Sequence, residues 1–138
     1  MKTDIQKQCE EAQSALYDLQ MFFMKARTKL TLFETIRKAQ IKIRKIDGMV
    51  ADIGPGIKLE EIRIVRCRLP TMKKYVSALS NVQKRCEEVF GDPNAAEAWL
   101  KSKVIALGGK TPLEIMETDT GIDLVLTELG RIEHGIVS

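Results

Sequence analysis

The sequence has few of the residues that build catalytic and metal centres. It contains one histidine, one tryptophan and three cysteines, and only 5% of its residues are aromatic. Cys9, Cys67 and Cys86 lie far apart and form no CxxC pair, which disfavours both a zinc site and a disulfide framework. We expect these thiols to be buried. His134 has no serine, cysteine or paired carboxylate at a useful spacing, so we expect no enzyme, no metal and no cofactor.

The sequence also lacks a long apolar run. No stretch of 18 or more apolar residues occurs, which excludes a transmembrane helix of ordinary length. Asp4, Glu10 and Glu11 interrupt the region after Lys2 that would form the apolar core of a signal peptide. These two absences predict a cytoplasmic protein.

Charge is divided unevenly along the chain. Residues 1–80 carry 16 Lys and Arg against 9 Asp and Glu, whereas residues 81–138 carry 6 against 10. The overall charge of +3 therefore hides a basic N-terminal part and an acidic C-terminal part. Such a split favours two surfaces with different partners, and the basic one is suited to nucleic acid. A pair of solvated helix faces would explain the same charges.

Helical periodicity dominates the N-terminal part. Heptad-spaced residues predict a long helix over residues 3–30 whose seam packs on the next helix or on a second copy: Cys9, Leu16, Phe23 and Leu30, interleaved with Ile5, Ala12, Leu19, Ala26 and Phe33. The apolar register then shifts, and Thr31 with Glu34 has the form of a capping box. We expect a second helix over 32–46 ended by Asp47-Gly48, with one continuous bent helix as the alternative.

Strong helix breakers follow. Gly54-Pro55-Gly56 predicts a turn. After it we expect a short helix that is stopped by Pro70, and then another helix from Thr71 to Phe90. A turn followed by a short basic helix is compatible with a degenerate helix-turn-helix.

The C-terminal part shows three helix starts. Asp92-Pro93 places an N-cap before a proline at the first helical position, and Trp99 is expected as a buried anchor of that helix. Thr111 and Glu114 form a second capping box. Thr118 or Asp119 is expected to cap a third helix. That helix has an apolar stripe of Ile122, Val125, Leu126, Leu129 and Ile132, and Gly135 is expected in the left-handed conformation after its end.

Three segments here carry a family resemblance: AWL (98–100), ALGGKTPLEIMETDTG (106–121) and LGRIEHGIVS (129–138). In this order and spacing they resemble the toxin-binding domain of Xre/MbcA/ParS antitoxins. The resemblance is strong over residues 86–138 and faint over 49–85. It implies a three-helix toxin-binding domain at 81–138. Residues 1–48 match no family pattern, and for residues 1–80 the periodicity and charge predict a basic helical domain, either a long helix or a helical hairpin, which makes the expected protein all-α.

The resemblance also implies a partner and a mechanism. The partner would be a RES-domain toxin, an NAD-consuming enzyme, whose pocket the domain blocks sterically. Carried over by motif, the toxin contacts would be Arg131, Glu133, His134, Gly135, Ile136, Val137 and Ser138. We expect a homo-oligomer or a toxin–antitoxin hetero-oligomer.

The basic residues of the N-terminal part suggest a second role. We expect this part to bind operator DNA and to repress its own operon. The DNA-binding residues would be Arg63, Arg66, Arg68, Lys73 and Lys74. Two alternatives stay open, namely a DNA-binding regulator without a toxin partner and a coiled-coil adaptor that does not bind DNA.

Overall fold

The computed structural model describes residues 3–135, and over this range its regular structure is helical. The helices are α1 (Asp4–Lys29), α2 (Leu32–Ile53), α3 (Glu60–Phe90), α4 (Pro93–Leu100), the 3-10 turn η1 (Ile105–Leu107), α5 (Pro112–Ile115) and α6 (Asp119–Glu133). The predicted all-α class is confirmed. None of the helices between Thr3 and Gly135 has the length and apolarity needed to cross a membrane.

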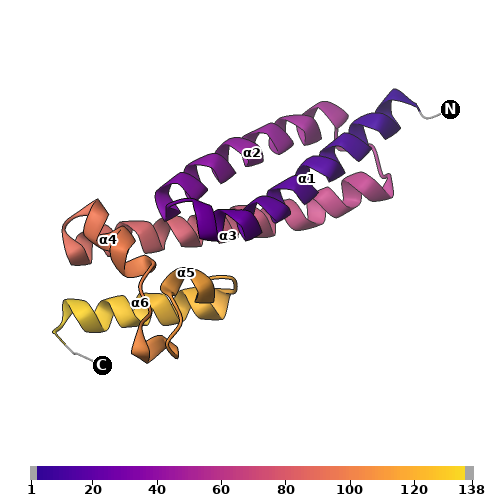
Figure 1. The fold of residues 1–138 in the computed structure, drawn as a ribbon. Helices are drawn as coiled ribbons and strands as arrows, with labels where there is room; N and C mark the ends of the chain where they lie inside the picture. Colours follow the sequence, from indigo (N-terminus) through magenta and orange to yellow (C-terminus); the bar gives the residue numbers. More distant parts are fainter. Residues whose placement is uncertain (1–2, 136–138) are drawn as a thin grey trace. The chain divides into compact units, whose positions relative to one another are not determined.

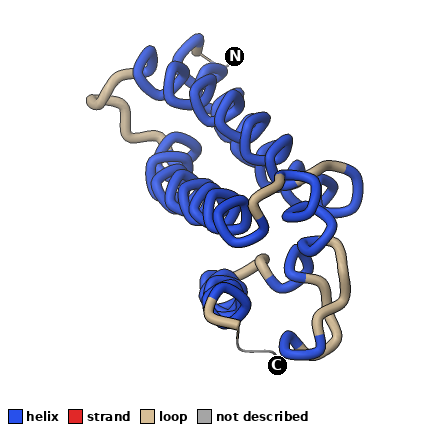
Figure 2. Tube along the Cα trace, turned by 90° about the vertical axis from the view of Figure 1, so that its left-hand side faces the viewer, coloured by secondary structure: helices blue, strands red, loops and turns tan. Residues whose placement is uncertain are grey.

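Contacts divide the chain into two compact units. One comprises the chain to Lys29 together with Thr35–Val76, and the other comprises Leu30–Glu34 and the chain from Ser77. In the first unit, α1, α2 and the start of α3 lie beside one another, and each runs in the direction opposite to the helix before it (Figure 1). The second unit consists of the end of α3 and the shorter elements α4, η1, α5 and α6, joined by tight loops (Figure 2).

The heptad seam of α1 is used inside the first unit. Cys9, Ala12, Leu16 and Leu19 are almost fully buried within the chain itself. Phe23 packs edge-on against Tyr75 of α3, with their ring centroids 5.2 Å apart. The seam therefore serves the intramolecular core, and oligomerisation of the chain stays a prediction.

A break after α1 separates the two N-terminal helices, as the capping pattern predicts. The Thr31 hydroxyl accepts a hydrogen bond from the Glu34 N–H at 3.1 Å and donates to the Glu34 carboxylate at 3.0 Å. The two-helix interpretation is confirmed, and the continuous bent helix is wrong.

Two predicted helix ends are wrong. The helix α2 continues through Asp47-Gly48 to Ile53, because its buried stripe continues from Ile46 before the glycine to Ile53 after it. The helix α3 continues through Pro70 without a break, so the separate short helix expected after Gly56 does not form. Its buried stripe stays in phase on both sides of the proline through Ile62, Val65, Leu69 and Val76. Burial of that face outweighs the cost of about 3 kcal/mol for an interior proline.

The cysteines differ in environment. Cys9 and Cys86 are fully buried, and Cys67 is exposed. Burial raises the pKa of Cys86 to about 12, and it also raises the pKa of Cys9. The expected burial is thus confirmed for two thiols and wrong for Cys67, which lies on an outer face of α3.

We expect one thiol per folded chain to react quickly with a disulfide reagent at pH 8. Cys67 is accessible. Cys86 is shielded by burial, and at pH 8 it stays protonated because its pKa is about 12. A colorimetric thiol assay should give one fast equivalent, and three after unfolding in guanidinium. The variant Cys67→Ser should abolish the fast phase, and a second fast thiol in the unmodified chain would contradict this assignment.

Candidate functional site

Side-chain caps fix the starts of the three C-terminal helices. Asp92 accepts a hydrogen bond from the Asn94 N–H at 3.1 Å, with Pro93 beginning α4. Thr111 and Glu114 form a complete capping box at α5, with reciprocal bonds of 3.2 and 3.3 Å. These caps were predicted and are confirmed. They set the directions of the helices independently of any partner.

The cap of α6 is also confirmed. The Thr118 hydroxyl accepts a hydrogen bond from the Gly121 N–H at 3.0 Å, which selects Thr118 over Asp119 as the N-cap. At the other end, Gly135 has a φ of 74°, in the left-handed region that was predicted for it. Leu129 and Val125 of the predicted stripe are fully buried.

A rigid turn connects α4 to α5. Val104 and Lys110 form an isolated antiparallel bridge in which the Val104 N–H donates to the Lys110 carbonyl at 3.1 Å. Gly108 and Gly109 both have positive φ, 75° and 76°, which reverses the chain inside this bridge. Turn geometry thus explains the two glycines, as the sequence favoured. The turn leaves the Ile105 side chain 88% exposed.

The outer face of α6 carries a second exposed apolar side chain. Leu124 is 52% exposed, on the side of the helix away from Val125 and Leu129. Arg131 follows it by seven residues, so the two lie on the same face about two turns apart, and Arg131 is exposed. Since η1 packs against α6, Ile105 and Leu124 belong to neighbouring elements of the second unit.

The remaining predicted toxin contacts are in different situations. Glu133 forms an ion pair with Arg85 of α3, and hydrogen bonding to Arg85 lowers the pKa of Glu133. His134 is the C-cap residue of α6 and is exposed, as is Gly135. Ile136, Val137 and Ser138 lie outside the described residues. Of the predicted contacts, Arg131, His134 and Gly135 are therefore exposed near the end of α6, while Glu133 is engaged within the unit.

Trp99 is only half-buried, so its predicted role as the anchor of α4 is only partly met. Its ring packs against Phe90 with centroids 5.6 Å apart. The fully buried residues of α4 are Ala96 and Leu100. Glu97 on the same helix accepts a hydrogen bond from the Leu32 N–H at 3.3 Å, which holds the start of α2 in the second unit.

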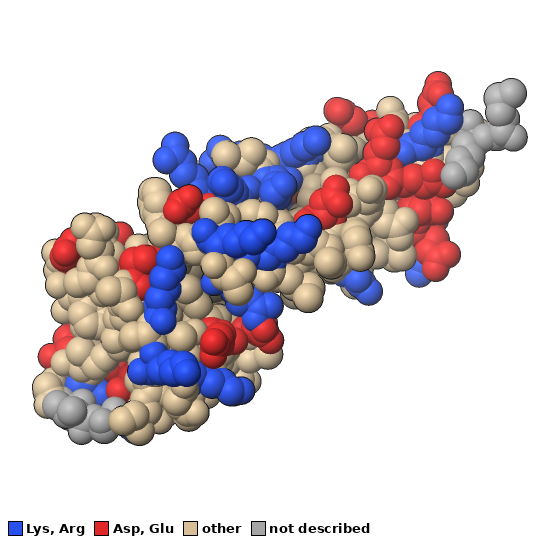
Figure 3. Space-filling view, viewed as in Figure 1, with Lys and Arg blue, Asp and Glu red and all other residues tan. Residues whose placement is uncertain are grey.

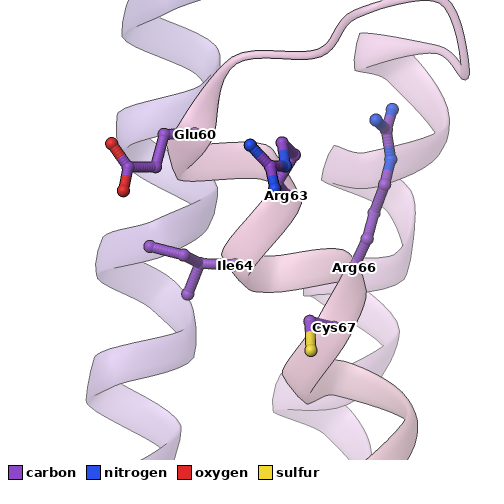
Figure 4. Close-up of a pocket in the computed structure, with 5 residues that line it drawn as sticks. All are labelled: Glu60, Arg63, Ile64, Arg66 and Cys67. Carbon is purple, nitrogen blue, oxygen red and sulfur yellow. The ribbon is translucent and has the colours of Figure 1, made fainter.

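The predicted DNA-binding cations lie on α3, and two of them are engaged in contacts within the chain. Arg63 and Arg66 line a pocket of about 430 Å³ with Glu60, Ile64 and Cys67 (Figure 4). Arg66 donates hydrogen bonds to the carbonyl groups of Gly54 and Ile57, so it fastens the loop before α3.

Of the other three cations, Lys73 is paired and Arg68 points in another direction, whereas Lys74 lies within about 20° of Arg63 around the helix axis. Lys73 forms an ion pair with Asp47 at 2.7 Å. Arg63, Arg68 and Lys74 are exposed. Arg63 and Arg68 differ in direction by about 140° around the helix axis, since each residue turns the helix by roughly 100°. DNA binding by this set stays a prediction.

Among the described residues, no three His, Cys, Asp or Glu side chains gather in a way that could hold a metal ion. The notable side chains that sequence reasoning missed are Ile105 and Leu124. Leu124 had a detectable signal, since it is an apolar residue outside the 122, 125 and 129 stripe. For Ile105, the only sequence signal of exposure is its position close to the Gly108-Gly109 turn.

Comparison with known proteins connects this unit to a domain family. Residues 85–135 match the family described as antitoxin Xre/MbcA/ParS C-terminal toxin-binding domain. A protein named antitoxin Xre from Photorhabdus laumondii subsp. laumondii is 44% identical over 106 residues, covering 76% of this chain and 64% of the relative. Another antitoxin Xre, from Yersinia enterocolitica serotype O:8 / biotype 1B, is 30% identical over 70 residues, covering 50% and 47%. The chain thus spans less than two thirds of each curated relative. The resemblance identified from the sequence motifs is confirmed.

Proposed function

We propose, from the premise that residues 85–135 are an Xre/MbcA/ParS toxin-binding domain, that this chain is an antitoxin that binds a protein toxin. The match to the toxin-binding domain is the observation that carries the proposal. It coincides with a unit in which side-chain caps and a bridged turn fix the exposed groups. Such preorganisation reduces the entropy lost when a partner binds.

The toxin would be a RES-domain enzyme whose pocket the antitoxin covers. The acidic C-terminal part supports this expectation, because residues 81–138 carry an excess of four negative charges. An enzyme that takes a dinucleotide needs cations around its pocket, and an acidic partner complements them. The exposed end of α6, with Arg131, His134 and Gly135, would lie toward the pocket entrance, followed by the last three residues.

Apolar anchors would supply most of the binding energy. Ile105 and Leu124 are large, exposed and carried by rigid elements of the matched domain. Interfaces are typically dominated by a few side chains that fill pockets on the partner. Arg131, on the Leu124 face of α6, would add a bidentate contact to a carboxylate at the edge of these anchors.

Co-expression tests the proposal. The product of the neighbouring gene, expressed alone, should stop growth, and this chain should restore growth and co-purify with it. A chain ending after Gly135 should lose rescue by a factor of ten or more in colony count if the last three residues enter the pocket. A harmless neighbour, or one that never co-purifies, would remove the toxin partnership and favour a DNA-binding regulator. Full rescue by the shortened chain would contradict only the proposal that the last three residues enter the toxin pocket.

Autorepression of the operon is the second candidate function, and a basic N-terminal part favours it. Residues 1–80 carry an excess of seven positive charges. A toxin-bound antitoxin that also contacts operator DNA would couple toxin supply to its own expression. An adaptor that recruits an unrelated protein through its N-terminal helices is the alternative, and it predicts no binding to DNA.

A further inference from the structure

The outward face of α2 carries as many cations as the most basic stretch of α3, but on α3 two of the five, Arg66 and Lys73, are engaged within the chain. Between Thr35 and Ile46 the helix carries five cations and no acid: Arg37, Lys38, Lys42, Arg44 and Lys45. Four of these side chains are exposed and Lys42 is half-buried. In the space-filling view, Lys and Arg side chains gather over α2 (Figure 3).

Helical geometry places these five cations on one side. At about 100° per residue they occupy an arc of roughly 160°, and they extend about 12 Å along the axis from Arg37 to Lys45. The opposite side is the buried stripe, which contains Ile36, Ala39, Ile43 and Ile46. The cations therefore form a single convex surface, which we call the α2 basic face.

Two acids lie beside this face. Glu34 accepts a hydrogen bond from the Thr31 hydroxyl in the cap of α2 and keeps its charge, whereas Asp47 pairs with Lys73. One cation is also held in place, because the Lys42 ammonium lies 5.3 Å from the centroid of the Phe22 ring. The five cations of the face thus outnumber the two acids beside it, and one of those acids is paired with a cation of α3.

The chemistry of the face favours a phosphate backbone over the other polyanions. Ile41, 59% exposed, lies amid the cations as the one large apolar side chain among the exposed residues of this stretch. An interfacial membrane helix needs a broad apolar side in addition to its basic one, and a protein interface needs apolar anchors. A rod-like convex face of lysines and arginines instead fits the groove edges of a duplex, where successive phosphates line up.

We propose that the α2 basic face binds the phosphate backbone of double-stranded nucleic acid without reading its sequence. This inference deepens the autorepression part of the proposed function and rests on it for the biological target, but it is independent of the toxin partnership. It moves the main electrostatic contact from α3, where Arg66 and Lys73 are already engaged within the chain, to α2. Sequence preference would then have to come from other groups.

The test uses the full chain and a fluorescein-labelled 20-base-pair duplex of arbitrary sequence. Fluorescence polarisation between 50 and 200 mM salt gives the affinity and its salt slope. The triple variant Arg37→Gln/Arg44→Gln/Lys45→Gln should bind at least tenfold more weakly at 100 mM salt. Its slope of log affinity against log salt should be smaller by about 2.7, near 0.9 for each lost phosphate contact. All three side chains are exposed, so the melting temperature should not fall.

A matched triple variant on α3 distinguishes the possible failures. Arg63→Gln/Arg68→Gln/Lys74→Gln removes the same charge from exposed members of the rival α3 set and should weaken duplex binding less than the α2 variant does. If this variant carries the loss instead, the α2 inference is overturned and DNA binding through α3 stands. If the unmodified chain does not bind this duplex, the α2 inference is overturned, whereas autorepression is tested separately with a duplex taken from the region upstream of the gene. Equal binding to polyglutamate or to phosphatidylserine vesicles would overturn the assignment to nucleic acid.

Discussion

Replacing Gly121 by alanine should unfold the C-terminal unit at ordinary temperature or nearly so. A Cβ built on Gly121 would lie 1.5 Å from the Ile115 carbonyl oxygen and 2.6 Å from its carbonyl carbon. Both atoms are backbone, so no side-chain rotation relieves the clash, and α6 would have to move away from the end of α5. We expect a loss of on the order of 3 kcal/mol or more in the free energy of unfolding.

Gly130 on the same helix provides the matched control. Nothing lies within 4 Å of a Cβ at Gly130, and its φ is in the ordinary helical range. Alanine there should stabilise the unit by up to about 1 kcal/mol, because it is the better helix former. Urea unfolding followed by fluorescence of Trp99, the only tryptophan of the chain, measures both changes in the second unit. Equal midpoints for the two variants would show that the close approach of α6 to Ile115 is not a feature of the folded protein.

The C-terminal unit was the more predictable part of the fold because its boundaries are local. A cap needs only a side chain and an N–H two or three residues away. A few adjacent residues therefore suffice to predict the caps, which join Thr111 to Glu114 and Thr118 to Gly121. The same holds for Gly108 and Gly109, because two adjacent glycines predict a turn without any knowledge of the bridge between their flanking residues.

Helix ends in the N-terminal part were less predictable because distant contacts decide them. Gly48 and Pro70 are local signals that predict the end of a helix. Both lie on exposed faces, and the buried stripes of α2 and α3 continue past them. Ile53 and Leu69 are buried by packing against other helices. A glycine or proline in the sequence carries no information about that packing. Tertiary packing here overrides intrinsic propensity.

The candidate sites show the same division. The motifs that resemble the toxin-binding domain could be found from sequence, because they are contiguous. Whether each cation is available for a partner could not be predicted from sequence. Arg66 donates hydrogen bonds to carbonyl groups 9 and 12 residues away, and Lys73 forms an ion pair with Asp47 on another helix. The exposure of Ile105 likewise depends on how the bridged turn projects it, and isoleucine in a sequence ordinarily indicates core.

Replacing Ile105 by aspartate should therefore damage toxin binding without damaging the fold. The side chain is 88% exposed, so it contributes little to the core, and a carboxylate at its position would remain solvated in the free chain. In the complex the same carboxylate would be buried against the apolar surface that received the isoleucine. Loss of an anchor of this kind costs about 2 kcal/mol or more, which is roughly a 30-fold rise in Kd. Calorimetric titration with the purified product of the neighbouring gene measures it.

Ile41→Asp is the control, because it makes the same change at an exposed isoleucine of the other unit, 59% accessible. If the toxin is bound by the second unit, this variant should keep toxin affinity within twofold. It should weaken duplex binding, since a negative charge then lies inside the α2 basic face. The same substitution at Ile105 and at Ile41 thus distinguishes toxin binding from duplex binding. Unchanged toxin affinity for Ile105→Asp, with tight binding by the unmodified chain, would place the toxin interface away from the bridged turn and leave the exposed end of α6 as the contact.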